Sequence, residues 1–175
     1  MFKKILCPID GSDHARKALD LAVDIAKKYS AELIILHVPH RTENIEALQR
    51  FAEIEGLTEH AGMELDRLRE MDFRVGVVNE SVIQDSGISS RLLIEVGQHI
   101  VDEARDYAND LGLKNVEARV EGGDPANRIL QSIEDDRVDC VVMGSRGLGE
   151  LKGMFLGSVS HKVANHAPCT CIAVK

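Results

Sequence analysis

The sequence predicts a doubly wound α/β fold, in which about five parallel strands form one sheet with helices on both faces. Two observations support this prediction. Short apolar runs alternate along the chain with longer segments whose apolar residues recur every three or four positions. Residues 2–38 also accommodate a strand, a helix and a second strand, the length of a βαβ unit with a right-handed crossover. The chain has 175 residues, 44% of them hydrophobic, which is enough to bury one core.

The first βαβ unit begins with the apolar run at residues 2–9, which is compatible with a buried strand and ends at the turn sequence PIDG. Ser12 is the candidate N-cap of the helix that follows. The apolar face of this helix consists of Ala15, Ala18, Leu19, Ala22, Ile25 and Ala26. Residues 32–38, which read ELIILHV, supply the second buried strand.

The second half of the chain repeats this alternation. Helices are predicted over residues 91–111, 125–135 and 159–165, and strands over residues 116–120, 138–143 and 169–174. Gly112 suits the end of the first of these helices, and Asp124 with Pro125 suits the start of the second. Pro168 ends the third.

Residues 41–90 do not fit the alternation as well. Apolar spacing suggests two amphipathic helices near residues 45–52 and 63–71 and a small strand at residues 73–78. We interpret the chain as a single domain, residues 1–175, with a variable insertion at about residues 41–90 on the ligand edge. A coiled linker is the alternative.

Composition limits the classes of partner. A net charge of −8 without a basic block argues against nucleic acid and against anionic membrane surfaces. No segment approaches the roughly 20 apolar residues of a membrane helix, and the apolar start is too short for a signal peptide. We therefore expect a cytoplasmic protein whose four cysteines are reduced thiols.

The glycine pattern G-x2-G-x9-G-S at residues 144–158 indicates a phosphate-binding element. It directly follows a predicted buried strand and precedes a predicted helix. Glycine permits close approach of the backbone, so that successive N–H groups at Gly144, Gly147 and Gly157 could converge on anionic oxygens. The predicted helix adds the partial positive charge of its amino terminus.

Four segments together resemble the universal stress protein family, specifically its ATP-binding branch. These segments are CPIDGS after the first strand, LHV at the end of the second, GGDPA, and GSRG followed by LGSVSHKV. The resemblance covers the first two strands and about residues 91–175, and it leaves most of residues 41–90 unexplained. It implies an adenine nucleotide alpha hydrolase-like fold and a homodimer paired through the C-terminal strand.

The resemblance also implies a site for ATP, or for ADP or AMP, with Mg²⁺ or Mn²⁺. The implied binding residues are Pro8, Ile9, Asp10, Val38, Met143, Gly144, Arg146, Gly147, Gly157, Ser158, Val159 and Ser160. Asp10 would lie near the ribose or ligate the metal, and Val38 would contact adenine through its backbone and apolar surface. The residues leave two alternatives open: Asp10 as only a helix-capping carboxylate, and Arg146 as a solvated side chain.

The histidines offer little support for a metal site. His37 and His40 would point to opposite faces of a strand unless Pro39 bends the chain. His161 and His166 lack a third ligand at metal spacing, so ordinary polar roles are favoured.

Enzymatic function finds less support than binding. The chain has no G-x4-G-K-[ST] element and no G-x-S-x-G elbow, and no general base stands out. The sequence after the first strand also lacks the phosphate loop of adenylating enzymes. We therefore expect an ATP-binding stress-response protein that acts as a nucleotide-dependent switch, with slow ATP hydrolysis left open. The alternative is a homodimeric interaction module that requires no nucleotide; its protein partner is unknown.

Overall fold

The computed structural model describes residues 2–39, 90–148 and 156–175. Within them the elements follow in the order β1 (Lys4–Pro8), α1 (Asp13–Tyr29), β2 (Glu32–His37), α5 (Ser90–Asp110), β3 (Val116–Val120), α6 (Pro125–Asp135), β4 (Cys140–Gly144), α7 (Ser158–His166) and β5 (Thr170–Val174). Every element predicted in these ranges is present, with ends shifted by at most two residues. The helices and the strand predicted in residues 41–90 lie outside the described residues.

The strands form a five-stranded sheet in the order β3-β2-β1-β4-β5, and every pairing is parallel. β1 and β2 pair in register from Lys4 opposite Glu32 to Pro8 opposite Leu36. β4 follows β1 on its other side. The predicted parallel α/β sheet is therefore confirmed, and its strand order reverses direction between β1 and β4.

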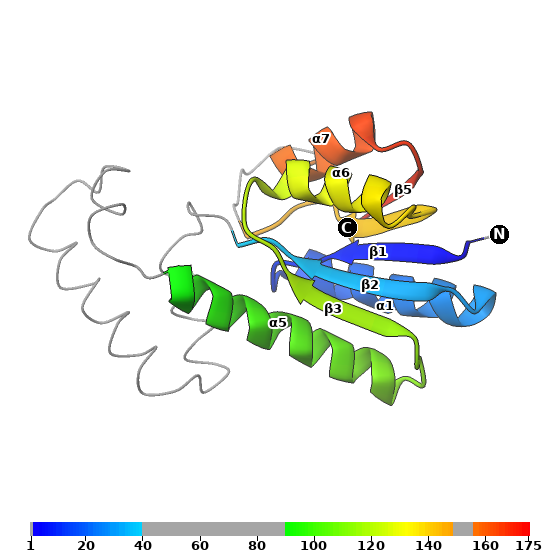
Figure 1. Cartoon of the computed structure of the whole chain (residues 1–175). Coiled ribbons are helices and arrows are strands. Elements are labelled where there is room, and N and C mark those ends of the chain that lie inside the picture. Colours follow the sequence, from blue (N-terminus) through cyan, green and yellow to red (C-terminus); the bar gives the residue numbers. More distant parts are fainter. Residues whose placement is uncertain (1, 40–89, 149–155) are drawn as a thin grey trace, which may run out of the picture. The chain divides into compact units, whose positions relative to one another are not determined.

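Helices cover both faces of the sheet. In Figure 1, α6 and α7 lie on one side, whereas α1 and the part of α5 from Gly97 onward lie on the other. The apolar side chains alternate accordingly. The core beneath α6 and α7 contains Leu6, Ile34, Leu36, Val38, Ile129, Ile133, Val141, Met143 and Val163. The intervening residues of β1 and β2 are buried on the opposite face, as expected for strands covered on both sides.

Local capping explains where the helices begin and end. The Ser12 hydroxyl accepts a hydrogen bond from the amide of Ala15 (3.2 Å), and the Asp124 carboxylate accepts one from the amide of Asn127 (2.9 Å). Gly112 follows α5 with a φ of +90°, a conformation that favours glycine. These predicted caps and the predicted stop are confirmed.

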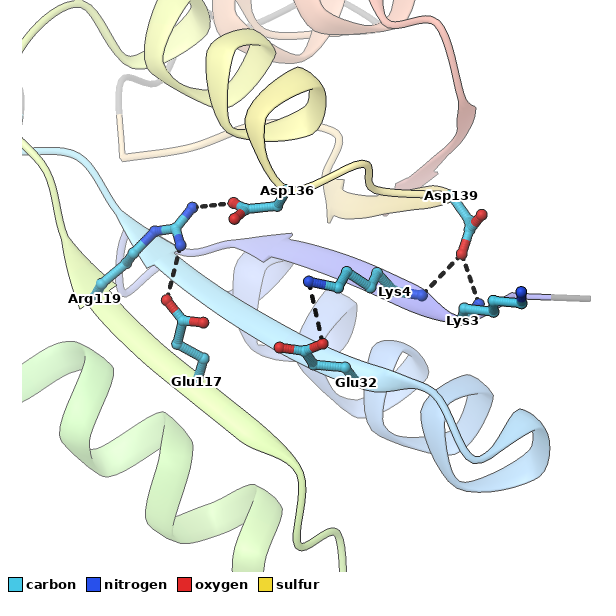
Figure 2. A network of polar contacts seen from close by, with 7 residues as sticks. All are labelled: Lys3, Lys4, Glu32, Glu117, Arg119, Asp136 and Asp139. Carbon is cyan, nitrogen blue, oxygen red and sulfur yellow. Dashed lines mark hydrogen bonds and ion pairs between the residues drawn. The ribbon is translucent and has the colours of Figure 1, made fainter.

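Figure 2 shows polar contacts that join neighbouring elements. The Asp139 carboxylate, just before β4, accepts hydrogen bonds from the amides of Lys3 (2.6 Å) and Lys4 (2.8 Å). The Lys4 ammonium pairs in turn with Glu32 at 3.3 Å. On β3, the Arg119 guanidinium pairs with three carboxylates, those of Glu117, Glu121 and Asp136.

The chain divides into two compact units, one of residues Met1–Thr42 with Gly97–Lys175 and the other of Glu43–Val96. All five strands belong to the first unit. No helix within the described ranges is long and apolar enough to cross a membrane.

Candidate functional site

The reversal of strand order between β1 and β4 locates the candidate site. In open parallel α/β sheets, ligands bind beyond the carboxyl ends of the strands at such a switch point. The residues that follow β1, β2 and β4 belong to this edge. The amino terminus of α7 belongs to it as well, because the amide of its cap residue Gly157 donates to the carbonyl of Ser145 (2.8 Å).

Asp10 joins two of the connections at this edge. One carboxylate oxygen accepts a hydrogen bond from the amide of Ser12 (3.0 Å), at the start of α1. The other accepts one from the amide of Leu148 (3.1 Å), which follows β4. Asp10 therefore contributes to the start of α1, as the capping alternative expected, and also holds the two sides of the switch point together.

Two glycines, one at the end of β4 and one after it, are required by close packing. A Cβ atom at Gly144 would lie 2.9 Å from the carbonyl oxygen of Arg146 and 3.0 Å from the backbone carbon of His14. A Cβ atom at Gly147 would lie 2.2 Å from the Asp10 carboxylate. Both glycines therefore bring the end of β4 close to the β1–α1 connection.

Ser145 and Ser160 connect the end of β4 to β5 and α7. The Ser145 amide donates to the carbonyl of Val174 (2.6 Å), and the Ser145 carbonyl accepts from the Ser160 hydroxyl (2.8 Å). The Ser160 hydroxyl is also near the carbonyl of Gly157 (3.1 Å). Its proton is therefore directed at protein carbonyls. The Ser145 hydroxyl is buried and has no hydrogen-bond partner among the described residues.

The amino terminus of α7 carries no side-chain cap. Gly157 is the N-cap residue, and among the described residues no side chain accepts a hydrogen bond from the first turn. A Cβ atom added at Gly157 would make only ordinary van der Waals contacts with the described residues, the nearest being the Cα of Arg146 at 3.5 Å. Ser158 is exposed and Val159 is partly buried. The first-turn amides of α7 therefore supply uncapped donors and partial positive charge.

At the end of β2, His37 and Val38 are both buried. The Nδ1 atom of His37 lies 2.8 Å from the carbonyl oxygen of Ile9. Burial lowers the pKa of His37, and this effect exceeds the opposing influence of the Ile9 carbonyl and the Asp10 carboxylate. The imidazole is therefore neutral at pH 7. His40 lies outside the described residues.

The remaining implied site residues differ in exposure. Met143 is buried in the core beneath α6 and α7, and Pro8 ends β1 with partial exposure. Arg146 is exposed and forms no ion pair with another described residue. A guanidinium in this position is available to an anionic ligand beside α7.

No group of three or more histidine, cysteine or acidic side chains suited to a metal ion occurs in the described ranges. His161 and His166 make ordinary polar contacts, to Asn165 and to the carbonyl of Lys162.

The four cysteines are free thiols. Burial is the largest influence on Cys140 and Cys169 and raises the pKa of each to about 11. These two side chains are therefore protonated at neutral pH and poorly suited to nucleophilic chemistry.

Several residues that shape this edge were not predicted as site residues. The amide of Leu148 binds Asp10, His14 packs against Gly144, and Ser145 bonds to β5 and α7. His37 was considered only as a metal ligand. Ser145 could have been noticed, since it lies inside the glycine pattern, but the partners of all four residues come from distant parts of the chain.

Comparison with known proteins agrees with this architecture. The family model described as Universal stress protein family matches residues 1–175. A universal stress protein of Bacillus subtilis strain 168, YxiE, is 35% identical over an alignment 189 positions long, which covers 100% of both chains.

Solved structures show the same fold. Universal stress protein UspA from Lactobacillus plantarum superimposes with a TM-score of 0.68 at 21% identity, covering 99% of this chain and 98% of its own. A universal stress protein in complex with cAMP superimposes with a TM-score of 0.61 at 23% identity, covering 99% of this chain and 97% of its own. The family model and the Bacillus relative both span the whole chain. This chain belongs to the universal stress protein family.

Proposed function

We propose that this protein binds an adenine nucleotide, ATP or its products ADP and AMP, with Mg²⁺ or Mn²⁺, at the carboxyl edge of the sheet. In this proposal the phosphates lie against Gly144, Gly147 and the amino terminus of α7. Adenine lies beside Val38, and Asp10 faces the ribose or the cation.

The observation that carries this proposal is the uncapped amino terminus of α7 at the switch point. Gly157 provides no side-chain acceptor for the first-turn amides, yet its own amide is bonded to Ser145 at the end of β4. Helix amino termini in this position bind phosphate groups. The exposed side chains of Arg146 and Ser158 add a cation and a hydroxyl next to these amides.

The family supports the choice of ligand. One structure of the same fold is a universal stress protein in complex with cAMP, which is an adenosine nucleotide. The described residues contain no arrangement that resembles the lysine and hydroxyl of a P-loop, so binding is better supported than rapid hydrolysis. We infer that nucleotide occupancy is the signal, and that the protein acts in the cytoplasm as a stress-response regulator.

Isothermal titration of the full-length chain with ATP and Mg²⁺ tests the proposal. We expect saturable binding with a Kd below about 1 mM. Gly157→Val should weaken ATP binding at least about tenfold, because its side chain occupies the space before the first turn of α7. The matched control is Gly122→Val, since nothing lies within 4 Å of a Cβ at Gly122.

Absence of saturable binding by the wild-type chain would refute the proposal. Equal ATP affinity in the wild type and in Gly157→Val would show that the phosphates are held elsewhere. Nucleotide that co-purifies with the protein, identified by mass spectrometry, would show which of ATP, ADP and AMP is retained.

A homodimer that pairs through β5, with or without nucleotide, is the second candidate. β5 is the last strand of the sheet and pairs only with β4 among the described strands. Its outer side therefore presents unpaired backbone groups, which another strand can satisfy.

A further inference from the structure

A histidine side chain replaces a backbone hydrogen bond where β1 and β2 end. The Ile9 amide donates to the carbonyl of Leu36 (2.9 Å), which continues the parallel pairing one residue beyond β1. In a parallel ladder the next bond would run from the Val38 amide to the Ile9 carbonyl. The Ile9 carbonyl instead faces Nδ1 of His37 at 2.8 Å.

This contact defines the protonation of the imidazole. A carbonyl oxygen can only accept, so Nδ1 must carry the hydrogen. The side chain is buried, with 2% of its surface exposed, and the imidazole is neutral. A neutral imidazole carries a single ring hydrogen, so His37 is the Nδ1–H tautomer. The ring is thus a fixed donor toward the end of β1.

Helix α5 leaves space for this ring at Gly97. A Cβ atom there would lie 2.7 Å from Cδ2 of His37 and 3.1 Å from Cγ1 of Val120. Glycine inside a helix costs about 1 kcal/mol relative to alanine. Its presence opposite His37 is explained by the room that the imidazole needs.

With the Ile9 carbonyl facing His37, the Val38 amide has no backbone acceptor among the described residues. Neither the amide nor the carbonyl of Val38 makes a backbone hydrogen bond within residues 2–39, 90–148 and 156–175. The side chain of Val38 is buried in the core beneath α6 and α7. The side chain of Val38 therefore holds the residue in place, while its backbone amide and carbonyl are a donor and an acceptor at the ligand edge.

We propose that His37 is a positioning residue for base recognition: by occupying the Ile9 carbonyl it keeps the backbone amide of Val38 available, beside the Val38 carbonyl, for the edge of adenine. This inference rests on the proposed nucleotide-binding function. Adenine presents a ring nitrogen that accepts and an amino group that donates. Guanine presents a donor and a carbonyl oxygen at the same positions, so it would leave both Val38 groups mismatched.

Two substitutions at position 37 separate the donor from the bulk of the ring. His37→Asn places an amide NH₂ near the position of Nδ1 and should preserve the bond to Ile9. His37→Leu fills the space without a donor, so that the Val38 amide can close onto the Ile9 carbonyl. Gly97→Ala leaves position 37 unchanged but pushes the imidazole from its place, which keeps the test available if His37→Leu does not fold.

The first measurement is amide hydrogen exchange in the nucleotide-free protein. Exchange at Val38 should be at least about tenfold slower in His37→Leu than in the wild type, because the amide gains a backbone acceptor. It should be unchanged in His37→Asn. Equal Val38 exchange in all three proteins would overturn the assigned role of His37.

The second measurement is the ratio of the Kd values for GTP and ATP, each with Mg²⁺. We expect the wild type and His37→Asn to favour ATP by about tenfold or more, and His37→Leu and Gly97→Ala to lose most of this preference. If the wild type prefers ATP and His37→Leu prefers it equally, only the role of His37 fails. If the wild type binds neither nucleotide, the proposed function fails, and base recognition fails with it.

Discussion

The carboxylate of Asp10 accepts a hydrogen bond from the backbone amide of Leu148 at 3.1 Å, although the two residues are 138 positions apart in the chain. This bond connects the residues after β1 to those after β4, across the point where the strand order reverses. Asp10 therefore shapes the candidate site whether or not it also contacts a ligand.

Asp10→Asn should loosen this connection while preserving the size of the side chain. The amide group keeps one acceptor and turns its NH₂ toward the other backbone amide, which costs about 1 kcal/mol. We expect faster hydrogen exchange at the amide of Leu148 or of Ser12. Gly147→Ala should have a similar effect on Leu148, since its Cβ would lie 2.2 Å from the carboxylate. Unchanged exchange in both variants would contradict the connection.

Gly144→Ala and Gly157→Ala should differ in stability although both lie in the same glycine pattern. An added Cβ at Gly144 meets backbone atoms at 2.9 Å and 3.0 Å, whereas at Gly157 the nearest atom is 3.5 Å away. We expect Gly144→Ala to lower the free energy of unfolding by about 1–3 kcal/mol. Gly157→Ala should lower it by less than about 1 kcal/mol. Urea denaturation checks the comparison, and the reverse order would refute it.

Asp139 should contribute to stability in a manner that depends on pH. Hydrogen bonds from the amides of Lys4 and Lys3 hold the pKa of this carboxyl below its ordinary value of 3.8. The stabilisation that the Asp139 carboxylate provides is therefore complete at pH values above its ordinary pKa. It is lost as the pH falls through the lower folded-state pKa. Asp139→Asn should destabilise the protein by less than about 1 kcal/mol at pH 7, because the group is largely solvated.

The difference between Asp139→Asn and the wild type should shrink as the pH falls below about 4, because the carboxyl is protonated first in the unfolded state and then, below its lowered folded-state pKa, in the folded state as well. Urea denaturation at pH 7, 4 and 3 measures this trend. A difference that stays constant over this range would show that the carboxylate charge is not involved. Asp135→Asn is a suitable control, because Asp135 is an exposed carboxylate of α6.

Ala173→Pro should separate pairing within the sheet from pairing between chains. Thr170 donates to the carbonyl of Asp139 (3.2 Å) and Val174 accepts from the amide of Ser145 (2.6 Å). Alternation along β5 therefore turns the amide of Ala173 away from β4. Proline at this position removes an outward donor without removing a bond to β4.

Sedimentation of the wild type and of Ala173→Pro tests the proposed β5 interface. We expect a dimer for the wild type and a monomer for Ala173→Pro at the same concentration. Ala173→Val keeps the amide and should remain dimeric. A dimer of unchanged strength in Ala173→Pro would place the interface elsewhere on the molecule.

Local sequence patterns were sufficient for the secondary structure of the described residues. Ser12 and Asp124 cap helices through side chains that reach amides three residues away, and Gly112 adopts its positive φ within a single turn. Apolar runs with no polar alternation indicated strands buried on both faces, and β1 and β2 are such strands. These features depend on neighbours in sequence, which is why they could be predicted.

Four short motifs also predicted membership of the universal stress protein family. The family match over residues 1–175 confirms this prediction. The individual binding residues remain predictions. For Ser160 the structure adds a role that the motif did not indicate, because its hydroxyl donates to the carbonyl of Ser145. For His37, the spacing of histidines raised only the question of a metal, whereas the contact that matters is with the carbonyl of Ile9.

The sequence by itself therefore determined the succession of strands and helices in the described residues, the N-caps Ser12 and Asp124, and the family of this protein. Only the tertiary structure decided the strand order β3-β2-β1-β4-β5, the hydrogen bond between Asp10 and Leu148, and the replacement of a ladder bond by His37. The physical reason is the separation along the chain between the residues that interact. Caps and apolar periodicity act over one or two helical turns, whereas these contacts join atoms that become neighbours only when the sheet is assembled.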